Sequence, residues 1–492
     1  MRNEIRFLRG GREVRLGNFN PMLTLLDYLR LEERALGTKE GCAEGDCGAC
    51  TVVLRKRVGG ETVYQPVNAC ILLAGQADGA DVIAVDDLAD GALHPVQQAM
   101  VEQHGSQCGF CTPGFVMALF ALYHTPRSGP PARAEVNDFI AGNLCRCTGY
   151  RPIVDAALAA CAHAPHDRFE DEESDLRHRL SDLDDGEDVM VEHGTRFFAA
   201  PATIPALAEL YLKHPDATLV SGATDVGLWI TKQLRDLAKI IWLGRVRGLD
   251  AIGVEPDAVT FGATVTHQDA LAHLAAIDPD LGALLRRFAG RQVRTVGTIG
   301  GNIANGSPIG DTPPALIALN STLTLQRGAA TRTLALEDFF IAYGKQDRAP
   351  GEFVRAVRVP KLAPNERFRC YKISKRFDSD ISAVMGAFRF TLHDRRIVSA
   401  RVAFGGMAAT PRRATRAEAA LSGASLDDQA NWAPALRALD ADFAPITDQR
   451  ASAGYRRDVA RGLLRKALTE VAGTPSAATR VVDLREDARV DR

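Results

Sequence analysis

The chain has 492 residues, more than one hydrophobic core normally organises, and this length predicts three or four domains. Its 59 basic and 61 acidic residues nearly cancel, which leaves no charge field that would gather nucleic acid or an anionic membrane. The first residues lack the apolar core of a signal peptide, and the most apolar run, residues 115–123, is too short to cross a bilayer. We therefore expect a cytoplasmic, multidomain protein with no nucleic-acid or membrane partner.

Two β-hairpins and one helix are predicted in the N-terminal segment. Residues 5–8 and 14–16 alternate apolar and charged side chains, residues 51–54 and 63–67 are rich in valine, and each pair flanks a Gly-Gly turn. Between the pairs, apolar residues recur at helical spacing over residues 22–29. Together these elements predict a small α+β module of the ferredoxin type.

Eight of the ten cysteines fall into two groups of four. In the first group four residues separate the first two cysteines, two separate the next two, and a distant fourth follows, which is the plant-type 2Fe-2S pattern. The second group pairs Cys-x-x-Cys with Cys-x-Cys, whose one-residue gap suits two sulfurs on one iron of a cluster better than a tetrahedral zinc corner. A zinc ribbon or plain buried thiols are the alternative, because Cys-x-x-Cys is common in zinc sites. The predicted ligands are Cys42, Cys47, Cys50 and Cys70 in the first group and Cys108, Cys111, Cys145 and Cys147 in the second; Cys161 and Cys370 receive no role.

A helical module follows the ferredoxin-type module, with helices predicted over residues 95–104, 115–123, 134–141 and 152–162. The second cysteine group lies at the ends of these helices. Free N–H groups and partial positive charge at a helix N-terminus favour an anionic iron–thiolate cluster there. Residues 163–194 are dense in Asp and Glu and poor in apolar residues, which predicts a solvated linker with no core of its own; an acidic docking segment is the alternative.

Two glycine-bearing turns mark the next domain. Residues 219–226 run from an expected strand into a helix over residues 227–237, and residues 296–311 form a longer turn. Accessible backbone N–H groups with Ser, Thr and Asn side chains can hold a pyrophosphate without a lysine. Neither turn has the G-x-G-x-x-G spacing of a Rossmann fingerprint, and each alone is compatible with an ordinary loop. Their place after two iron–sulfur modules favours a cofactor site.

The runs over residues 44–51, 107–114 and 143–152, the order of the two cysteine groups and the two glycine turns resemble the xanthine dehydrogenase branch of the molybdenum hydroxylases. The resemblance implies a multidomain α+β fold. Its expected parts are a β-grasp 2Fe-2S ferredoxin-like domain (residues 1–90), a four-helix 2Fe-2S domain (91–162), the acidic linker (163–194), a vanillyl-alcohol-oxidase-type α/β FAD-binding domain (195–365), an α+β flavoprotein C-terminal domain (366–475) and a tail (476–492).

The resemblance also implies the residues that hold FAD. They are Leu219, Val220, Ser221, Gly222, Ala223, Thr224, Asp225, Val226, Phe288, Val296, Gly297, Thr298, Ile299, Gly300, Gly301, Asn302, Ser307, Ile309, Asp311, Val354 and Lys372. Lys372 fits a surface lysine equally well, and Val354 fits any core strand. Residues 374–382, with Lys375, Arg376, Asp378 and Asp380, resemble the loop beside the flavin that influences access of nicotinamide.

In function, the resemblance implies an electron-transfer small subunit with no catalytic residue apart from the flavin. By this resemblance, we expect hypoxanthine or xanthine to be oxidised at molybdenum on a large molybdopterin-binding subunit, and electrons to pass through the helical-domain cluster, the plant-type cluster and FAD to NAD. The chain stops after the expected C-terminal flavoprotein domain, so we expect half of an enzyme, in a heterotetramer of two small and two large chains. Gln107 resembles the residue that contacts the pterin.

Two alternatives stay open. The first is another molybdenum hydroxylase, acting on an aldehyde, carbon monoxide or an aromatic heterocycle, because the absent subunit chooses the substrate. Fusion of the iron–sulfur and flavin parts in one chain favours xanthine over these. The second is a zinc-stabilised binding protein with an inert α/β domain.

Overall fold

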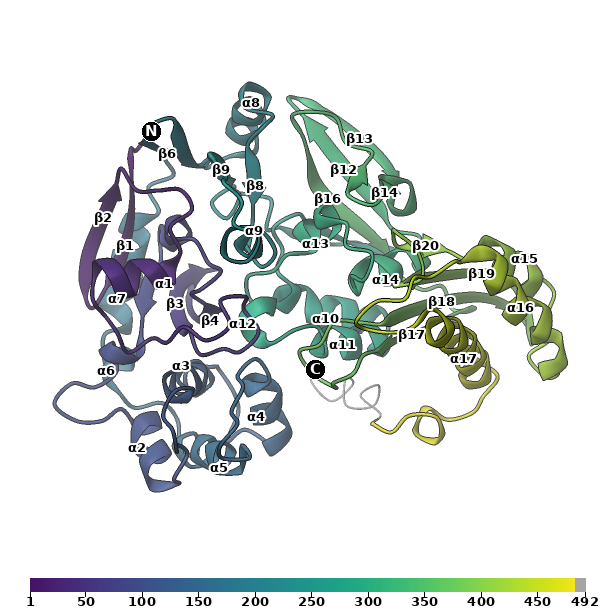
Figure 1. The fold of residues 1–492 in the computed structure, drawn as a ribbon, viewed down its shortest axis with the longest axis horizontal. Coiled ribbons are helices and arrows are strands. Elements are labelled where there is room, and N and C mark those ends of the chain that lie inside the picture. The colour runs from purple at the N-terminus through teal and green to yellow at the C-terminus, as the bar shows by residue number, and fades with distance from the viewer. Residues whose placement is uncertain (483–492) are drawn as a thin grey trace. The chain divides into compact units, whose positions relative to one another are not determined.

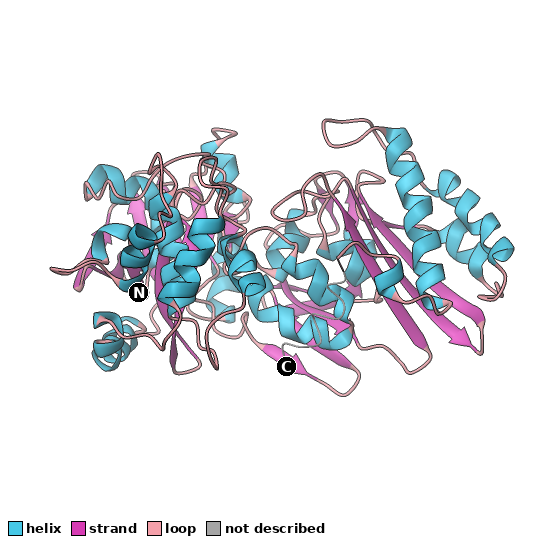
Figure 2. Cartoon of the chain, turned by 90° about the horizontal axis from the view of Figure 1, so that it is seen from below, coloured by secondary structure: helices cyan, strands magenta, loops and turns pink. Residues whose placement is uncertain are grey.

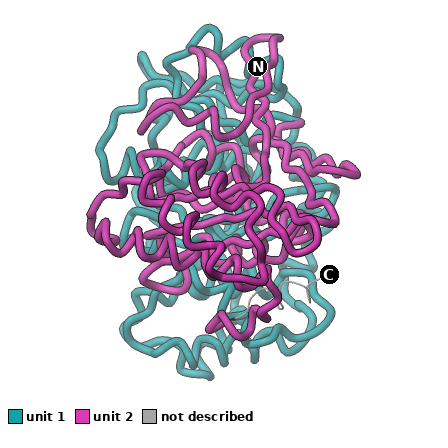
Figure 3. Tube along the Cα trace, turned by 90° about the vertical axis from the view of Figure 1, so that its right-hand side faces the viewer, with its two compact units in different colours: residues 1–247, 289–297 teal, residues 248–288, 298–492 magenta. Residues whose placement is uncertain are grey.

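The computed structural model describes residues 1–482 (Figure 1). The chain forms two compact units, each of two separate segments (Figure 3). Unit 1 contains residues 1–247 and 289–297, and the described part of unit 2 contains residues 248–288 and 298–482. Both units combine helices with sheets (Figure 2). Within residues 1–482, no helix combines the length and the apolar character that a membrane span requires.

A five-stranded mixed sheet, in the order β2-β1-β5-β3-β4, forms the N-terminal part of unit 1. The two predicted hairpins are confirmed: β1 (Glu4–Arg9) pairs with β2 (Arg12–Gly17), and β3 (Thr51–Val58) pairs with β4 (Glu61–Asn68). β5 (Asp81–Ile83) joins them, parallel to β1 and antiparallel to β3. The predicted helix is α1 (Leu25–Asp27), continued by a π-helical turn, η1 (Tyr28–Glu32), and it buries leucines on one face.

Four helices form the next part of unit 1 and confirm the four predicted ones. They are α2 (Pro95–Glu102), α3 (Thr112–Tyr123), α4 (Arg133–Ile140) and α5 (Arg151–Ala160). Every residue of α3 from Gly114 to Tyr123 is buried, as expected of a helix that is apolar all round. The other three helices bury only part of their surface, so α3 is the centre of this module.

The acidic segment is folded, so the prediction of a solvated linker without a core was wrong. It contains α6 (Arg168–Asp171) and α7 (Glu173–Leu183). Leu176, Leu180 and Leu183 lie at helical spacing on α7 and are buried together with Leu8 of β1. Three leucines on one face are enough to dock an acidic helix, and the average composition of the segment hid this pattern.

A four-stranded sheet completes unit 1, in the order β6-β7-β9-β8. β7 (Arg196–Ala200), β9 (Lys239–Trp242) and β8 (Thr218–Val220) run parallel, while β6 (Val189–His193) is antiparallel to β7. The expected domain start at residue 195 therefore falls inside a hairpin. The helices of this part are α8 (Ile204–Lys213), α9 (Val226–Thr231) and α12 (Arg291–Arg294). The helix predicted over residues 227–237 thus ends early, at Thr231.

Unit 2 begins with a five-stranded antiparallel sheet, in the order β10-β11-β16-β12-β13. Its strands are β10 (Ile252–Val254), β11 (Ala258–Gly262), β16 (Glu352–Pro360), β12 (Thr322–Arg327) and β13 (Ala330–Ala335), and a small hairpin joins β14 (Phe340–Ala342) to β15 (Lys345–Gln346). Its helices are α10 (His267–Ile277), α11 (Pro279–Arg286), α13 (Ile299–Asn305) and α14 (Thr312–Ala318). Residues 299–305 are therefore helical, and the prediction of one long turn over residues 296–311 was wrong there. Thr298 caps this helix through its hydroxyl.

An antiparallel meander forms the rest of unit 2, with β17 (Glu366–Ile373), β18 (Val384–His393), β19 (Arg396–Gly405) and β20 (Arg412–Arg413). α15 (Thr415–Leu421) and α17 (Ala453–Val471) pack on the meander, and α16 (Ala433–Asp442) packs on both of these helices. Aromatic residues such as Phe388, Phe404 and Trp432 fill the shared core. Of the predicted tail, residues 476–482 are described and residues 483–492 lie outside the described residues.

Candidate functional site

The four cysteines of the first group lie together. Cys42 and Cys47 each donate a backbone N–H to the sulfur of the other, both at 3.3 Å, and the Cys70 sulfur is within hydrogen-bonding reach of Cys42 and Cys50. Hydrogen bonds from the thiols of Cys47 and then Cys70 lower the pKa of Cys42, and the same contacts raise the pKa of Cys47 and Cys70. Four neighbouring sulfurs, three of which accept backbone N–H groups, fit a 2Fe-2S cluster.

The second group also converges. The sulfur of Cys111 contacts that of Cys145, and the sulfur of Cys147 contacts that of Cys108. Burial, reinforced by Cys145, raises the pKa of Cys111 to about 12. Burial acts in the same direction on Cys145, but hydrogen bonds led by the Thr148 hydroxyl hold the pKa of Cys145 below its ordinary value. Cys108 and Cys147 are exposed, whereas Cys111 and Cys145 are half-buried, so one side of this four-sulfur set faces outward.

The first glycine turn connects β8 to α9 in unit 1. Gly222 packs so closely on the backbone of Val296 and Gly297 that any side chain would collide with it. The structure thus brings two of the predicted FAD residues against the turn. The carbonyl of Ser221 accepts hydrogen bonds from Gln76 at 2.8 Å and from the Trp242 indole at 3.2 Å. The turn is therefore rigidly supported.

The remaining predicted FAD residues belong to unit 2: Phe288, Thr298, Ile299, Gly300, Gly301, Asn302, Ser307, Ile309, Asp311, Val354 and Lys372. Lys372 is 6% exposed, which rules out the alternative of a surface lysine. Its ammonium group lies 2.6 Å from Asp311, whose other oxygen accepts from Ser382 at 2.5 Å. Val354 is buried in β16.

Arg287 is a neighbour of this ion pair that sequence reasoning missed. Its guanidinium donates to the carbonyl of Lys372 at 3.0 Å and to that of Phe377 at 3.1 Å, and it stacks on the Phe377 ring. Burial lowers the pKa of Arg287 despite Asp311 nearby. The only feature of the sequence that could have pointed to Arg287 is its position next to Phe288, one of the predicted FAD residues. In the loop over residues 374–382, the backbone N–H of Arg376 donates to Asp380 at 2.8 Å, so the loop is braced internally.

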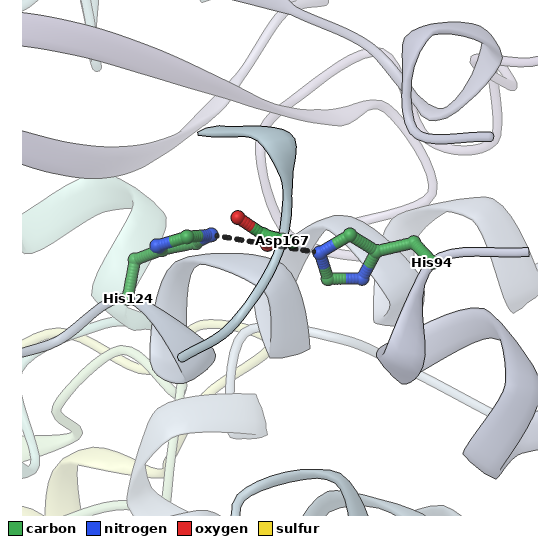
Figure 4. A group of neighbouring side chains, drawn as sticks. All are labelled: His94, His124 and Asp167. Carbon is green, nitrogen blue, oxygen red and sulfur yellow. Dashed lines mark hydrogen bonds and ion pairs between the residues drawn. The ribbon is translucent and has the colours of Figure 1, made fainter. Parts of the chain in front are cut away.

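A second set of side chains of metal-ligand type lies away from the cysteines. The side chains of His94, His124 and Asp167 are buried, and both imidazole rings turn toward one carboxylate (Figure 4). The Nε2 atoms of His94 and His124 lie 2.6 and 3.0 Å from the same oxygen of Asp167. Hydrogen bonds from His124 and His94 outweigh burial and hold the pKa of Asp167 well below its usual range.

The hydrogen-bond partners argue against a metal ion at these three residues. Nδ1 of His94 accepts the backbone N–H of Val96 at 3.2 Å, so in the neutral ring Nε2 carries the proton. A metal-bound histidine usually does the reverse and donates its second ring N–H to an acceptor. Asp167 also caps α6. The three residues therefore attach the acidic segment to the helical module. Asp167 is 73 positions from His94 and 43 from His124 in the sequence, so no local pattern indicated this contact.

Comparisons with known proteins agree with this arrangement of parts. Residues 84–158 match the family described as a 2Fe-2S binding domain, residues 193–362 match the FAD binding domain in molybdopterin dehydrogenase, and residues 369–471 match the CO dehydrogenase flavoprotein C-terminal domain. The chain is therefore similar to the iron–sulfur and FAD portion of molybdenum hydroxylases. These matches confirm the predicted multidomain α+β fold of this molybdenum hydroxylase portion.

Individual proteins similar to this chain are named for different substrates. A xanthine dehydrogenase from Emericella nidulans is 32% identical over 99% of the chain, which spans 40% of that relative's length. A reconstituted CO dehydrogenase from Oligotropha carboxidovorans is 26% identical with a TM-score of 0.54, over 58% of this chain and 100% of that one. A quinoline 2-oxidoreductase from Pseudomonas putida 86 is 25% identical with a TM-score of 0.51, over 56% of this chain and 95% of that one.

Proposed function

We propose that this chain is the electron-transfer subunit of a xanthine dehydrogenase. The observation behind the proposal is the 32% identity to a xanthine dehydrogenase over 99% of the chain, together with two four-sulfur groups in one compact unit. In this proposal Cys42, Cys47, Cys50 and Cys70 hold one 2Fe-2S cluster, and Cys108, Cys111, Cys145 and Cys147 hold the other. The residues proposed to bind FAD are the turn over residues 219–226, Val296 and Gly297 in unit 1, and the predicted residues of unit 2.

The chemistry of the proposed groups explains why one chain would combine them. A 2Fe-2S cluster exchanges single electrons and FAD exchanges one or two, which allows a two-electron oxidation to reach NAD in single steps. The chain's own residues bind and insulate these groups: N–H groups of the cysteine loops offset sulfur charge, and Lys372 with Asp311 forms a buried polar pair in unit 2.

The proposed partner is a large chain that binds molybdopterin and oxidises a purine. Support comes from the length of the curated relative, of which this chain spans 40%, and from the exposed cysteines of the second group. Gln107 is proposed at the contact with the pterin. We propose an assembly of two small and two large chains. Size-exclusion chromatography with light scattering should give the mass of two copies of each chain.

The deciding experiment is a visible spectrum of the complex, purified with its partner under anaerobic conditions. Bleaching by xanthine that recovers on adding NAD supports the proposed substrate and electron route. Bleaching by NADH alone retains the iron–sulfur and flavin assignment and refutes xanthine. A colourless protein containing zinc refutes the whole proposal, because zinc thiolates do not absorb visible light.

A second candidate is the same electron-transfer role in a hydroxylase of carbon monoxide, an aldehyde or an aromatic heterocycle. The structural likeness to a CO dehydrogenase and to a quinoline 2-oxidoreductase favours it, at 26% and 25% identity. The same complex tested with carbon monoxide, benzaldehyde and quinoline would bleach with one of them.

A further inference from the structure

One hydrogen bond joins the two cysteine groups directly. The backbone N–H of Leu144 donates to the carbonyl of Cys47 at 2.9 Å. Cys47 belongs to the first group, and Leu144 is covalently bonded to Cys145 of the second group. The residue that precedes one proposed cluster ligand, Cys145, is therefore hydrogen-bonded to the carbonyl of another, Cys47, and both lie in unit 1.

Two glycines make this close approach possible. Gly48 has a φ of +69°, and a side chain there would run into the carbonyl of Gly142 and the amide of Asn143. A side chain at Gly114, in the first turn of α3, would run into the carbonyl of Gly48. Backbone therefore meets backbone where the two cysteine loops touch, and no side chain could be inserted without separating them.

Asn143 closes the contact from the helical side. Its amide nitrogen donates to the carbonyl of Gly48 at 3.0 Å and lies 3.3 Å from the hydroxyl of Thr51. Thr51 donates to the same carbonyl at 2.7 Å. Asn143 is 2% exposed, so its amide depends on protein partners. It directly precedes Leu144 and thereby fixes the peptide that bonds to Cys47.

Gln292 holds Asn143 from a distant part of the chain. Its amide nitrogen donates to the Asn143 oxygen at 2.7 Å and lies 3.3 Å from the Thr51 hydroxyl, and the side chain is 1% exposed. The Gly48 carbonyl can only accept, so it requires the nitrogen of Asn143 and leaves the Asn143 oxygen facing Gln292. The Gly48 carbonyl and the Thr51 hydroxyl thus fix the orientation of the Asn143 amide, and the Asn143 oxygen fixes that of the Gln292 amide.

We propose that Asn143 and Gln292 form an amide lock that sets the rate of electron exchange between the two clusters. The inference rests on the proposed function, because it needs 2Fe-2S clusters in both cysteine groups. In each exchange one electron leaves the reduced cluster and enters the oxidised one, and no bond forms or breaks. The lock keeps the Leu144 N–H aligned with the Cys47 carbonyl. Neither amide contacts a sulfur in the described hydrogen-bond network, so both are positioning residues.

The test is Gln292→Met in the full chain carrying both clusters. The substitution keeps the volume and removes the donor to Asn143. Photoreduced deazaflavin injects less than one electron per chain, and rapid-freeze EPR follows its redistribution between the clusters. We expect exchange about tenfold slower, as for a lost orienting hydrogen bond of about 1.4 kcal/mol. We also expect a smaller spin–spin splitting when both clusters are reduced.

Asp138→Asn is the matched control. Asp138 pairs with Arg294, which lies on α12 as Gln292 does, at 3.2 Å, and this ion pair joins α12 to α4 without contacting Asn143. We expect exchange and splitting in this variant to equal those of the wild type.

Each outcome separates the lock from the proposed function. Unchanged exchange and splitting in Gln292→Met overturn the lock. Equal slowing in Asp138→Asn overturns it as well, because helix docking alone would then explain the effect. A wild-type chain that contains only one 2Fe-2S cluster refutes the proposed function instead. If Gln292→Met loses a cluster, Gln292→Leu, which also lacks a donor, is measured in the same way, and normal exchange in that variant overturns the lock.

Discussion

Replacing Lys372 tests the buried ion pair of unit 2. The side chains of Lys372 and Asp311 are 3% and 5% exposed, and their charged atoms lie 2.6 Å apart. Lys372→Met leaves the carboxylate of Asp311 buried with the Ser382 hydroxyl as its remaining side-chain donor in the described part of the chain. Removing one partner of a buried pair costs about 3–5 kcal/mol of unfolding free energy, because the remaining charge is uncompensated. We expect about 3 kcal/mol, because Ser382 still donates.

The double variant Lys372→Met with Asp311→Asn removes the orphaned charge as well. It should be more stable than Lys372→Met alone by about 1–3 kcal/mol, the range of coupling between contacting residues. Trp432, which is 1% exposed in the core of unit 2, reports urea unfolding. Trp229 and Trp242 lie in unit 1 and are replaced by phenylalanine in all the variants compared.

The order of stabilities decides the matter. If Lys372→Met is as stable as the double variant, the charge on Asp311 is not stabilised by Lys372 and the reasoning fails. Bound FAD, measured after acid release from variants that retain Trp229 and Trp242, gives a separate result. If Lys372 also holds FAD as proposed, both variants lose FAD to a similar extent while their stabilities differ.

Three further predictions concern other groups. Cys147→Ser should remove the EPR signal of the helical-module cluster and keep that of the plant-type cluster; loss of both signals would contradict two separate clusters. Burial would raise the pKa of Glu470, but its contacts with Arg480, Thr479 and Arg369 lower it to about 2, below its ordinary value. The contribution of Glu470 to the free energy of unfolding is therefore present above about pH 4 and is lost as the pH falls toward 2. Trp432 fluorescence during acid titration should show this loss in the wild type, and a Glu470→Gln variant with an equally steep loss would contradict it. Asp167→Ala leaves two buried histidine donors unpaired and should destabilise the acidic segment by about 1–3 kcal/mol, measured by proteolysis near α6. EDTA should leave the proteolysis of this segment in the wild type unchanged. Stabilisation of the segment by added zinc would refute the conclusion that these three residues bind no metal.

Local patterns in the sequence were sufficient for much of the fold. The cysteine spacings predicted which sulfurs come together, because each loop brings its own ligands within a few residues. The β3–β4 hairpin then returns Cys70 to the first group, and α3 and α4 return Cys145 and Cys147 to the second. The hairpins and the four helices follow from short-range periodicity. The acidic segment was misread because composition was averaged over a stretch in which only Leu176, Leu180 and Leu183 decide the packing.

Contacts between distant residues were not predictable in the same way. Asn143 and Gln292 are 149 positions apart, and either amide alone has many possible roles. From the sequence alone Lys372 is compatible with a surface lysine, because its partner Asp311 lies 61 positions earlier in the chain. His94, His124 and Asp167 meet only because three separate helix ends converge. In each case the decisive property is burial of a polar group, and burial depends on tertiary packing.

The divided make-up of unit 1 has a consequence for synthesis. All eight predicted cluster cysteines have been translated by residue 147, but Gln292 is made only after residues 248–288, which belong to unit 2. Chains are made from the N-terminus, and earlier parts fold first. A growing chain therefore displays both sets of sulfurs before the glutamine that braces Asn143 exists. If the two groups hold clusters as proposed, iron and sulfide can enter them before α12 returns to brace Asn143.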